Sequence, residues 1–213
     1  MWRRLVPVLM VALLCATACA PSAVSTAAGP TASLTPASPA TIGQPADDGA
    51  RIVGIQTIDG RTRDLTVESP AVGTVMVRLL LPSTFADQPT ARFPVLYLLH
   101  GGGGEYTDWT TNTDVEAFTA PTRLLVVMPA AVTSTMGELG TDRPHGGTGG
   151  STAWETFHLT ELRQLLERNW QAGDARAIAG LSLGGLGTVN YAGRHPDLLR
   201  RSPRTAAPST CGA

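Results

Sequence analysis

The sequence contains no lysine. Its sixteen Lys-or-Arg positions are all arginines, and these are scattered along the chain. With seventeen acidic residues the formal net charge is −1 at pH 7. Neither a basic run nor a stripe of aromatic and basic residues is present, so the chain lacks the electrostatic footprint of a nucleic-acid-binding protein. We therefore expect no nucleic-acid partner.

Cysteine is also scarce, with three residues in the whole chain. Cys15 lies in a segment predicted to be removed, which leaves Cys19 and Cys211 and excludes a disulfide framework. No pair of His or Cys residues shows metal-ligand spacing with matching partners. We expect no metal and no other cofactor.

A hydrophobic run long enough to span a membrane is absent as well. Residues 5–15 are apolar and follow a short basic start, which predicts a signal peptide over residues 1–18. Ala16-Thr17-Ala18-Cys19 fits ordinary signal-peptidase cleavage and also resembles a bacterial lipobox. We therefore expect an exported protein, attached to a membrane through lipidated Cys19. The alternative is a secreted protein with an incidental cysteine.

The rest of the chain divides by composition into three parts. Residues 19–50 are dominated by Ala, Pro, Ser and Thr, which predicts a disordered tether. Residues 51–199 carry the apolar patterns of a folded domain, and residues 200–213 have no large apolar side chain and form a tail. One domain of this length can bury a sizeable core.

The folded part reads as an α/β domain. Short strands joined by turns come first, followed by continuous apolar strands that are typical of a parallel sheet covered on both faces. Helical spacing of apolar residues over 154–170 places a helix between the last two strands. The predicted strands are 52–58, 65–68, 73–81, 94–99, 124–128 and 175–179. We expect a mostly parallel central sheet with antiparallel N-terminal strands.

The pentapeptide Gly180-Leu181-Ser182-Leu183-Gly184 follows a short apolar strand and precedes a helix predicted over 183–193. This is the context of a nucleophile elbow, a sharp turn at which the flanking Gly180 and Gly184 must lack a Cβ atom. The turn would expose the hydroxyl of Ser182 and aim a helix N-terminus at it. A glycine-rich turn with a capping serine is the structural alternative.

A second glycine-rich segment, residues 100–104, follows the central apolar strand. Its glycines, among them Gly101 and Gly103, would let backbone N–H groups face a ligand, as in the second half of an oxyanion hole. A phosphate loop is excluded, because the segment matches neither Gly-Lys-Ser/Thr nor a dinucleotide fingerprint. His100 precedes the serine, whereas this fold orders its triad serine, acid, histidine, so we expect His100 to shape the loop.

Together these segments resemble an esterase family that groups esterase D-type S-formylglutathione hydrolases, feruloyl and acetylxylan esterases and the secreted mycolyltransferases. The resemblance covers about residues 74–199, and it rests on an ordered series of motifs. The motifs are Leu96-Tyr97-Leu98-Leu99-His100-Gly101-Gly102-Gly103-Gly104, Tyr106-Thr107-Asp108-Trp109, Val126-Val127-Met128-Pro129, Trp154-Glu155-Thr156-Phe157, Ala179-Gly180-Leu181-Ser182-Leu183-Gly184-Gly185 and Arg194-His195-Pro196-Asp197.

The resemblance implies an α/β-hydrolase fold and a serine esterase or acyltransferase that acts on small-molecule, carbohydrate or lipid esters. It implies Ser182 as the nucleophile and the N–H groups of Gly102 and Leu183 as the oxyanion hole. Trp109 and Trp154 are expected to be packing residues. Whether water or a sugar hydroxyl accepts the acyl group stays open.

The triad acid and base have no counterpart after Ser182. His195 and Asp197 lie at the far end of the predicted helix, at roughly 1.5 Å per residue too far for proton transfer. His145 falls in a glycine-rich loop, and His158 is expected on the packed side of its helix. We therefore expect a fold that lacks its C-terminal part through a frameshift or early stop, and an inactive chain. A non-catalytic surface lipoprotein and an unstable product are the alternatives.

Overall fold

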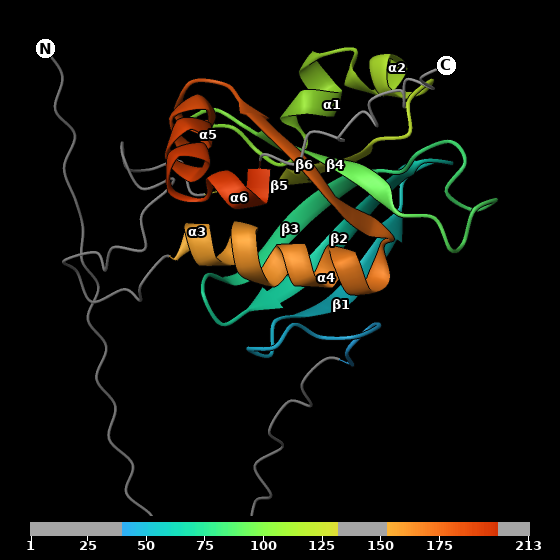
Figure 1. Cartoon of the computed structure of the whole chain (residues 1–213), viewed down its shortest axis with the longest axis horizontal. Helices are drawn as coiled ribbons and strands as arrows, with labels where there is room; N and C mark the ends of the chain where they lie inside the picture. The colour runs from blue at the N-terminus through green and yellow to red at the C-terminus, as the bar shows by residue number, and fades with distance from the viewer. Residues whose placement is uncertain (1–39, 132–152, 200–213) are drawn as a thin grey trace, which may run out of the picture. The chain divides into compact units, whose positions relative to one another are not determined.

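A single mixed sheet forms the centre of the computed structural model, which describes residues 40–131 and 153–199 (Figure 1). Its strands lie in the order β1-β2-β3-β5-β4-β6. Their bounds are β1 Arg51–Thr57, β2 Thr62–Ser69, β3 Gly73–Leu80, β4 Phe93–Leu99, β5 Leu125–Pro129 and β6 Ala172–Gly180. Strands β1, β2, β3 and β5 pair antiparallel in turn, and β4 lies parallel to both β5 and β6. The predicted antiparallel opening and parallel continuation are confirmed.

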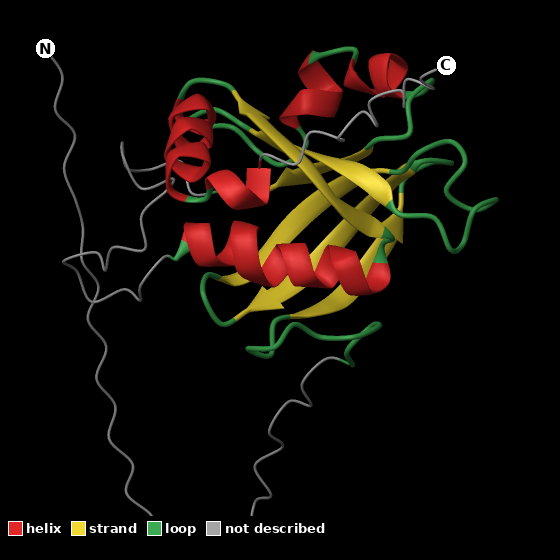
Figure 2. Cartoon of the chain, viewed as in Figure 1, coloured by secondary structure: helices red, strands yellow, loops and turns green. Residues whose placement is uncertain are grey.

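In Figures 1 and 2 the helical segment over residues 154–169 lies across one face of the sheet. On the opposite face Trp109 and Val115, from two short helices, pack against Val126 and its buried neighbours. The helices are α1 Asp108–Asn112, α2 Val115–Thr119, α3 Trp154–Thr156, the π-helical turn η1 Phe157–Glu161, α4 Leu162–Asn169, α5 Leu183–Arg194 and α6 Pro196–Leu199. The helix predicted over 154–170 is thus found as three consecutive pieces, with a π-helical turn in the middle. The elbow helix predicted over 183–193 is confirmed and ends before Pro196.

Alternation along the strands explains the two layers of helices. In β5, Leu125 and Val127 join the core beneath α4, whereas Val126 and Met128 pack on the opposite face near Trp109. A strand whose side chains are buried in both directions must read as a continuous apolar run, which is the pattern seen in the sequence. Helix α4 closes the first face with Leu162, Leu165 and Leu166, all fully buried.

The start of the folded part differs from the prediction. The tether was expected to reach residue 50, but the segment 44–50 packs against α4. The backbone N–H of Gln44 donates to Asn169 Oδ1 at 2.7 Å, and Ala46 and Ala50 are buried in the core. Small alanines can enter a core without giving an apolar signal in the sequence, which is why composition placed the boundary too late. The predicted signal peptide, Cys19, His145 and the tail lie outside the described residues.

Candidate functional site

The Gly180–Gly184 turn has the geometry that a nucleophile elbow requires. Strand β6 ends at Gly180 and helix α5 begins at Leu183, so only two residues make the reversal. Ser182 is exposed and adopts φ 53° and ψ −115°, a region that costs an ordinary side chain about 1–3 kcal/mol. Strain of this kind persists only where the surrounding packing imposes it.

Packing imposes the turn, because at Gly180 and Gly184 other backbone atoms occupy the space that a side chain would need. A Cβ atom on Gly184 would lie no more than 2.5 Å from the carbonyl oxygens of Leu99 and His100. A Cβ atom on Gly180 would lie 2.8 Å from the backbone nitrogen of Gly185. The prediction that these positions cannot carry side chains is therefore confirmed.

The glycine-rich loop lies beside this turn, because β4 and β6 are neighbours and Leu99 pairs with Gly180. A Cβ atom on Gly101 would be 3.7 Å from Ser182 Cβ, and one on Gly102 would be 2.8 Å from Leu183 Cδ1. Gly103 takes φ 75°, a conformation that glycine adopts readily. The structure thus brings Gly101, Gly102, Ser182 and Leu183 together, as the sequence predicted.

A small cavity of about 90 Å³ opens next to this cluster. It is lined by His100, Gly101, Asp108, Trp109, Asn112, Thr113 and Leu181. Trp109, predicted to be a packing residue, is half-buried and forms part of this wall, whereas Trp154 is buried in the core as predicted. The contribution of α1 to the wall was not predicted, and the Tyr-Thr-Asp-Trp segment was the signal that could have indicated it.

The three histidines of the described segments are engaged elsewhere than at Ser182. His100 Nδ1 lies 2.8 Å from the Gly101 carbonyl oxygen and its Nε2 lies 3.0 Å from the Ala131 nitrogen. His158 contacts Tyr191 and Ala130, and His195 Nε2 lies 2.6 Å from Glu155 Oε1. The expectation that His100 shapes the loop agrees with its position. No general base contacts the serine within residues 40–131 and 153–199.

Burial lowers the pKa of His158 to about 4. A histidine near 6.5 when unfolded then binds its proton more weakly in the folded state, so stability is highest above pH 6.5. As the pH falls from 6.5 to 4, we expect the free energy of unfolding to drop by up to about 3 kcal/mol on account of this group.

Urea unfolding of the wild type and of His158→Phe at pH 7 and pH 4.5 measures that loss. Burial raises the pKa of Glu161, so its contribution to the free energy of unfolding increases as the pH falls, opposite to that of His158. Comparing the wild type with His158→Phe isolates the contribution of His158. The difference in the free energy of unfolding between the two proteins should be smaller at pH 4.5 than at pH 7. An equal difference at both pH values would show that His158 is not buried in its neutral form.

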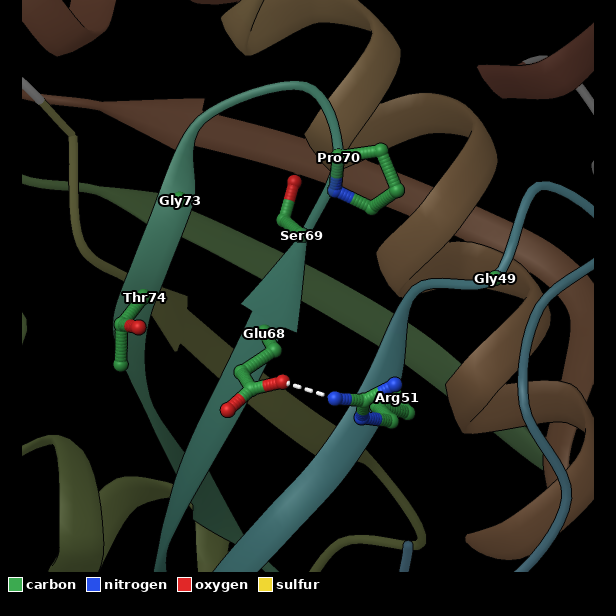
Figure 3. Close-up of a pocket in the computed structure, with 7 residues that line it drawn as sticks. All are labelled: Gly49, Arg51, Glu68, Ser69, Pro70, Gly73 and Thr74. Atoms are coloured by element: carbon green, nitrogen blue, oxygen red, sulfur yellow. Dashed lines mark hydrogen bonds and ion pairs between the residues drawn. The ribbon is translucent and has the colours of Figure 1, made fainter. Parts of the chain in front are cut away.

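A larger cavity, of about 220 Å³, lies elsewhere, between β1, β2 and the turn into β3. Figure 3 shows the Glu68 carboxylate and the Arg51 guanidinium pointing toward one another in its lining. They form an ion pair at 2.5 Å. The hydroxyl of Ser69 bonds the buried carboxylate of Glu161. None of the predicted site residues lines this cavity. Among the described residues no group of His, Cys, Asp and Glu side chains is arranged to hold a metal ion.

The sheet, the elbow and the adjoining glycine loop define an α/β-hydrolase fold. The family model described as Putative esterase matches residues 70–202, and the chain belongs to this family. Esterase Rv1288 of Mycobacterium tuberculosis is 32% identical over 160 residues, covering 72% of this chain and 34% of its own length. The mycolyltransferase Ag85A of Mycobacterium leprae is 34% identical over 111 residues, with 50% and 34% covered.

Solved structures agree on the fold. A ferulic acid esterase superposes with a TM-score of 0.54 at 28% identity, covering 67% of this chain and 57% of its own. The S-formylglutathione hydrolase of Agrobacterium tumefaciens gives a TM-score of 0.60 at 16% identity, with 70% and 58% covered. The chain spans about a third of the length of the curated relatives it matches. No described helix is both long and apolar enough to cross a bilayer.

Proposed function

We propose that Ser182 is the nucleophile of an exported serine esterase or acyltransferase. Its hydroxyl attacks the carbonyl carbon of a carboxylic ester, the alcohol leaves, and water or a second alcohol releases the acyl group from the enzyme. The observation that carries this proposal is the exposed, strained Ser182 between β6 and α5, directly beside the glycine loop. The ferulic acid esterase and mycolyltransferase relatives support ester chemistry.

The backbone N–H groups of Leu183 and Gly102 are the proposed oxyanion donors. Leu183 is the first residue of α5, where N–H groups lack partners within the helix and the helix dipole favours negative charge. Gly102 approaches Leu183 from the end of β4. Two such donors stabilise a tetrahedral oxyanion more than the uncharged ester, which is the basis of the rate enhancement.

We infer that the general base and its acid belong to a longer chain. This follows from the bonds that already occupy His100, His158 and His195. We therefore propose that the chain as given turns over esters poorly. The same observation would suit a non-catalytic surface protein that retains the fold, which is the second candidate function.

A chimera tests the proposal against that alternative. Residues 1–199 are joined to the part of Esterase Rv1288 that follows its matched region, where the proposal requires the missing acid and histidine to lie. We expect the chimera to cleave short p-nitrophenyl esters and the chain alone to cleave them at least about a hundredfold more slowly, since triad residues act as a unit. A folded chimera that shows no turnover would favour the non-catalytic function.

Lipid attachment at Cys19 is proposed for the exported form. With Cys19 intact, the protein should partition with membranes and incorporate labelled fatty acid, because several acyl chains hold a lipoprotein firmly. Cys19→Ala should lose the label and appear in the medium. If both forms are released equally, the protein is secreted and the cysteine is incidental.

A further inference from the structure

One peptide group just after β5 is held between two buried imidazoles. The N–H of Ala131 points at His100 Nε2, with 3.0 Å between the nitrogens, and the carbonyl oxygen of Ala130 lies 3.2 Å from His158 Nε2. These two groups belong to the same peptide unit and point in opposite directions, as in any trans peptide. His100 and His158 are 2% and 1% exposed.

The partners fix the tautomer of each ring. A backbone N–H can only donate, so His100 Nε2 must carry a lone pair, and its Nδ1 must carry the proton it donates to the Gly101 carbonyl at 2.8 Å. A backbone carbonyl can only accept, so His158 Nε2 carries the proton. His158 Nδ1 then accepts from the Tyr191 hydroxyl at 3.0 Å.

The bond from His100 to Gly101 has a consequence for the proposed oxyanion hole. The Gly101 carbonyl and the Gly102 N–H form one peptide unit, so turning the carbonyl toward His100 turns the Gly102 N–H away from it. The N–H of Gly104 also donates to that carbonyl, at 3.2 Å. The direction of the Gly102 N–H is therefore set by the two hydrogen bonds that the Gly101 carbonyl accepts, one from the His100 side chain and one from the Gly104 N–H.

At its other end the series of bonds reaches the elbow helix. Tyr191 is fully buried on α5, whose first residue follows Ser182. We propose that His158 and His100 are positioning residues: together with the Ala130–Ala131 peptide they join α5 to the glycine loop and hold the Gly102 N–H in its oxyanion-binding direction. The catalytic part of this inference rests on the proposed function of Ser182; the bonds themselves do not.

The surroundings of His158 favour its neutral form. Trp154 and Phe157 pack against the ring from its own helix, with ring centroids 5.7 Å and 5.3 Å away. From the other elements, the groups that face it are the Tyr191 hydroxyl of α5, the Ala130 carbonyl beyond β5, and His100 at the end of β4. No carboxylate is among these described neighbours, so nothing there stabilises a second proton.

Nitrogen-15 NMR of the histidine-labelled wild-type protein tests the tautomers without any substitution. At pH 7 we expect His100 as the Nδ1–H form and His158 as the Nε2–H form. We also expect slow solvent exchange of the Ala131 amide, measured by NMR or by mass spectrometry of its peptide. Either ring in the other tautomer would overturn the proposal, as would fast exchange at Ala131.

His158→Phe keeps a ring of similar size and removes both hydrogen bonds. We expect a shift of the Gly102 amide resonance and amide exchange at Ala131 at least about tenfold faster. Introduced into the chimera, the same substitution should slow the reaction of Ser182 with a fluorophosphonate by about tenfold, against about 100-fold or more when an oxyanion donor is lost outright. His158→Gln keeps an N–H donor for the Ala130 carbonyl. Its rates of Ala131 amide exchange and of fluorophosphonate reaction should therefore both lie close to the wild-type values. His195→Gln, outside this series of bonds, is the matched control and should change neither rate.

The two proposals fail separately in these measurements. The predicted tautomers and exchange, with Ser182 unreactive in a folded chimera, would support the positioning bonds and refute the proposed nucleophile. A reactive Ser182 whose rate and Gly102 resonance are the same in His158→Phe would refute the positioning role alone. A merely structural histidine would lower stability without moving the Gly102 resonance.

Discussion

Replacing Ser182 by alanine should lower the rate of ester turnover of the chimera described above at least about a thousandfold, since the nucleophile and its base act as a unit. The residual rate would come from the oxyanion donors alone. Alanine keeps the positive φ of this position, so the free energy of unfolding should change little. The measurement is p-nitrophenyl ester hydrolysis followed against urea unfolding of the same preparations.

Ser182→Gly separates the chemistry from the strain at this position. Glycine adopts φ 53° far more readily than serine, so this variant should be more stable by about 1 kcal/mol while being equally inactive. Gain of stability with loss of turnover is the result expected of a strained nucleophile. Retained turnover in Ser182→Ala would mean that the elbow is only a structural turn.

Gly184→Val should destabilise the fold by about 3 kcal/mol or more, at the upper end of overpacking effects. The added Cβ atom would meet the carbonyl oxygens of Leu99 and His100, backbone atoms at the end of β4 that the neighbouring strands β5 and β6 hold in place. The strand and the elbow would have to separate, which also displaces Ser182 from the glycine loop. Denaturant unfolding measures the loss.

Gly193→Ala is the matched control for that substitution, because Gly193 lies in the same helix and a Cβ atom there meets nothing within 4 Å. It should leave stability unchanged or raise it by about 1 kcal/mol through helix propensity. If Gly184→Val changed the free energy of unfolding no more than Gly193→Ala does, α5 would not approach β4 as closely as the structure shows.

The elbow and the glycine loop could be predicted from the sequence because each is a local pattern. Gly180, Ser182 and Gly184 are separated by single residues, and the turn they form dictates their spacing. The bonds around Ala130 and Ala131 could not be predicted, because alanine carries no functional group and the partners come from distant strands and helices. For the same reason the packing of Ala46 and Ala50 was missed: small residues enter a core without any periodic signal.

For His158 the sequence predicted the position of the side chain but not its hydrogen-bond partners. Helical spacing correctly placed it on the packed side of its helix, where it is 1% exposed. Its partners depend on the π-helical turn over 157–161, which propensity does not indicate. Sequence patterns therefore located the residue, and only the three-dimensional arrangement gave it a role.

The role of Ser182 is tested most directly by locating the covalent adduct formed by a fluorophosphonate. The chimera and Ser182→Ala are treated in parallel, digested, and analysed by mass spectrometry of the peptide that spans β6 and α5. If Ser182 is the nucleophile, the chimera carries one adduct, on Ser182, and that peptide of the variant carries none. An adduct on another residue, or a folded chimera that remains unmodified, would contradict the claim that Ser182 is the nucleophile.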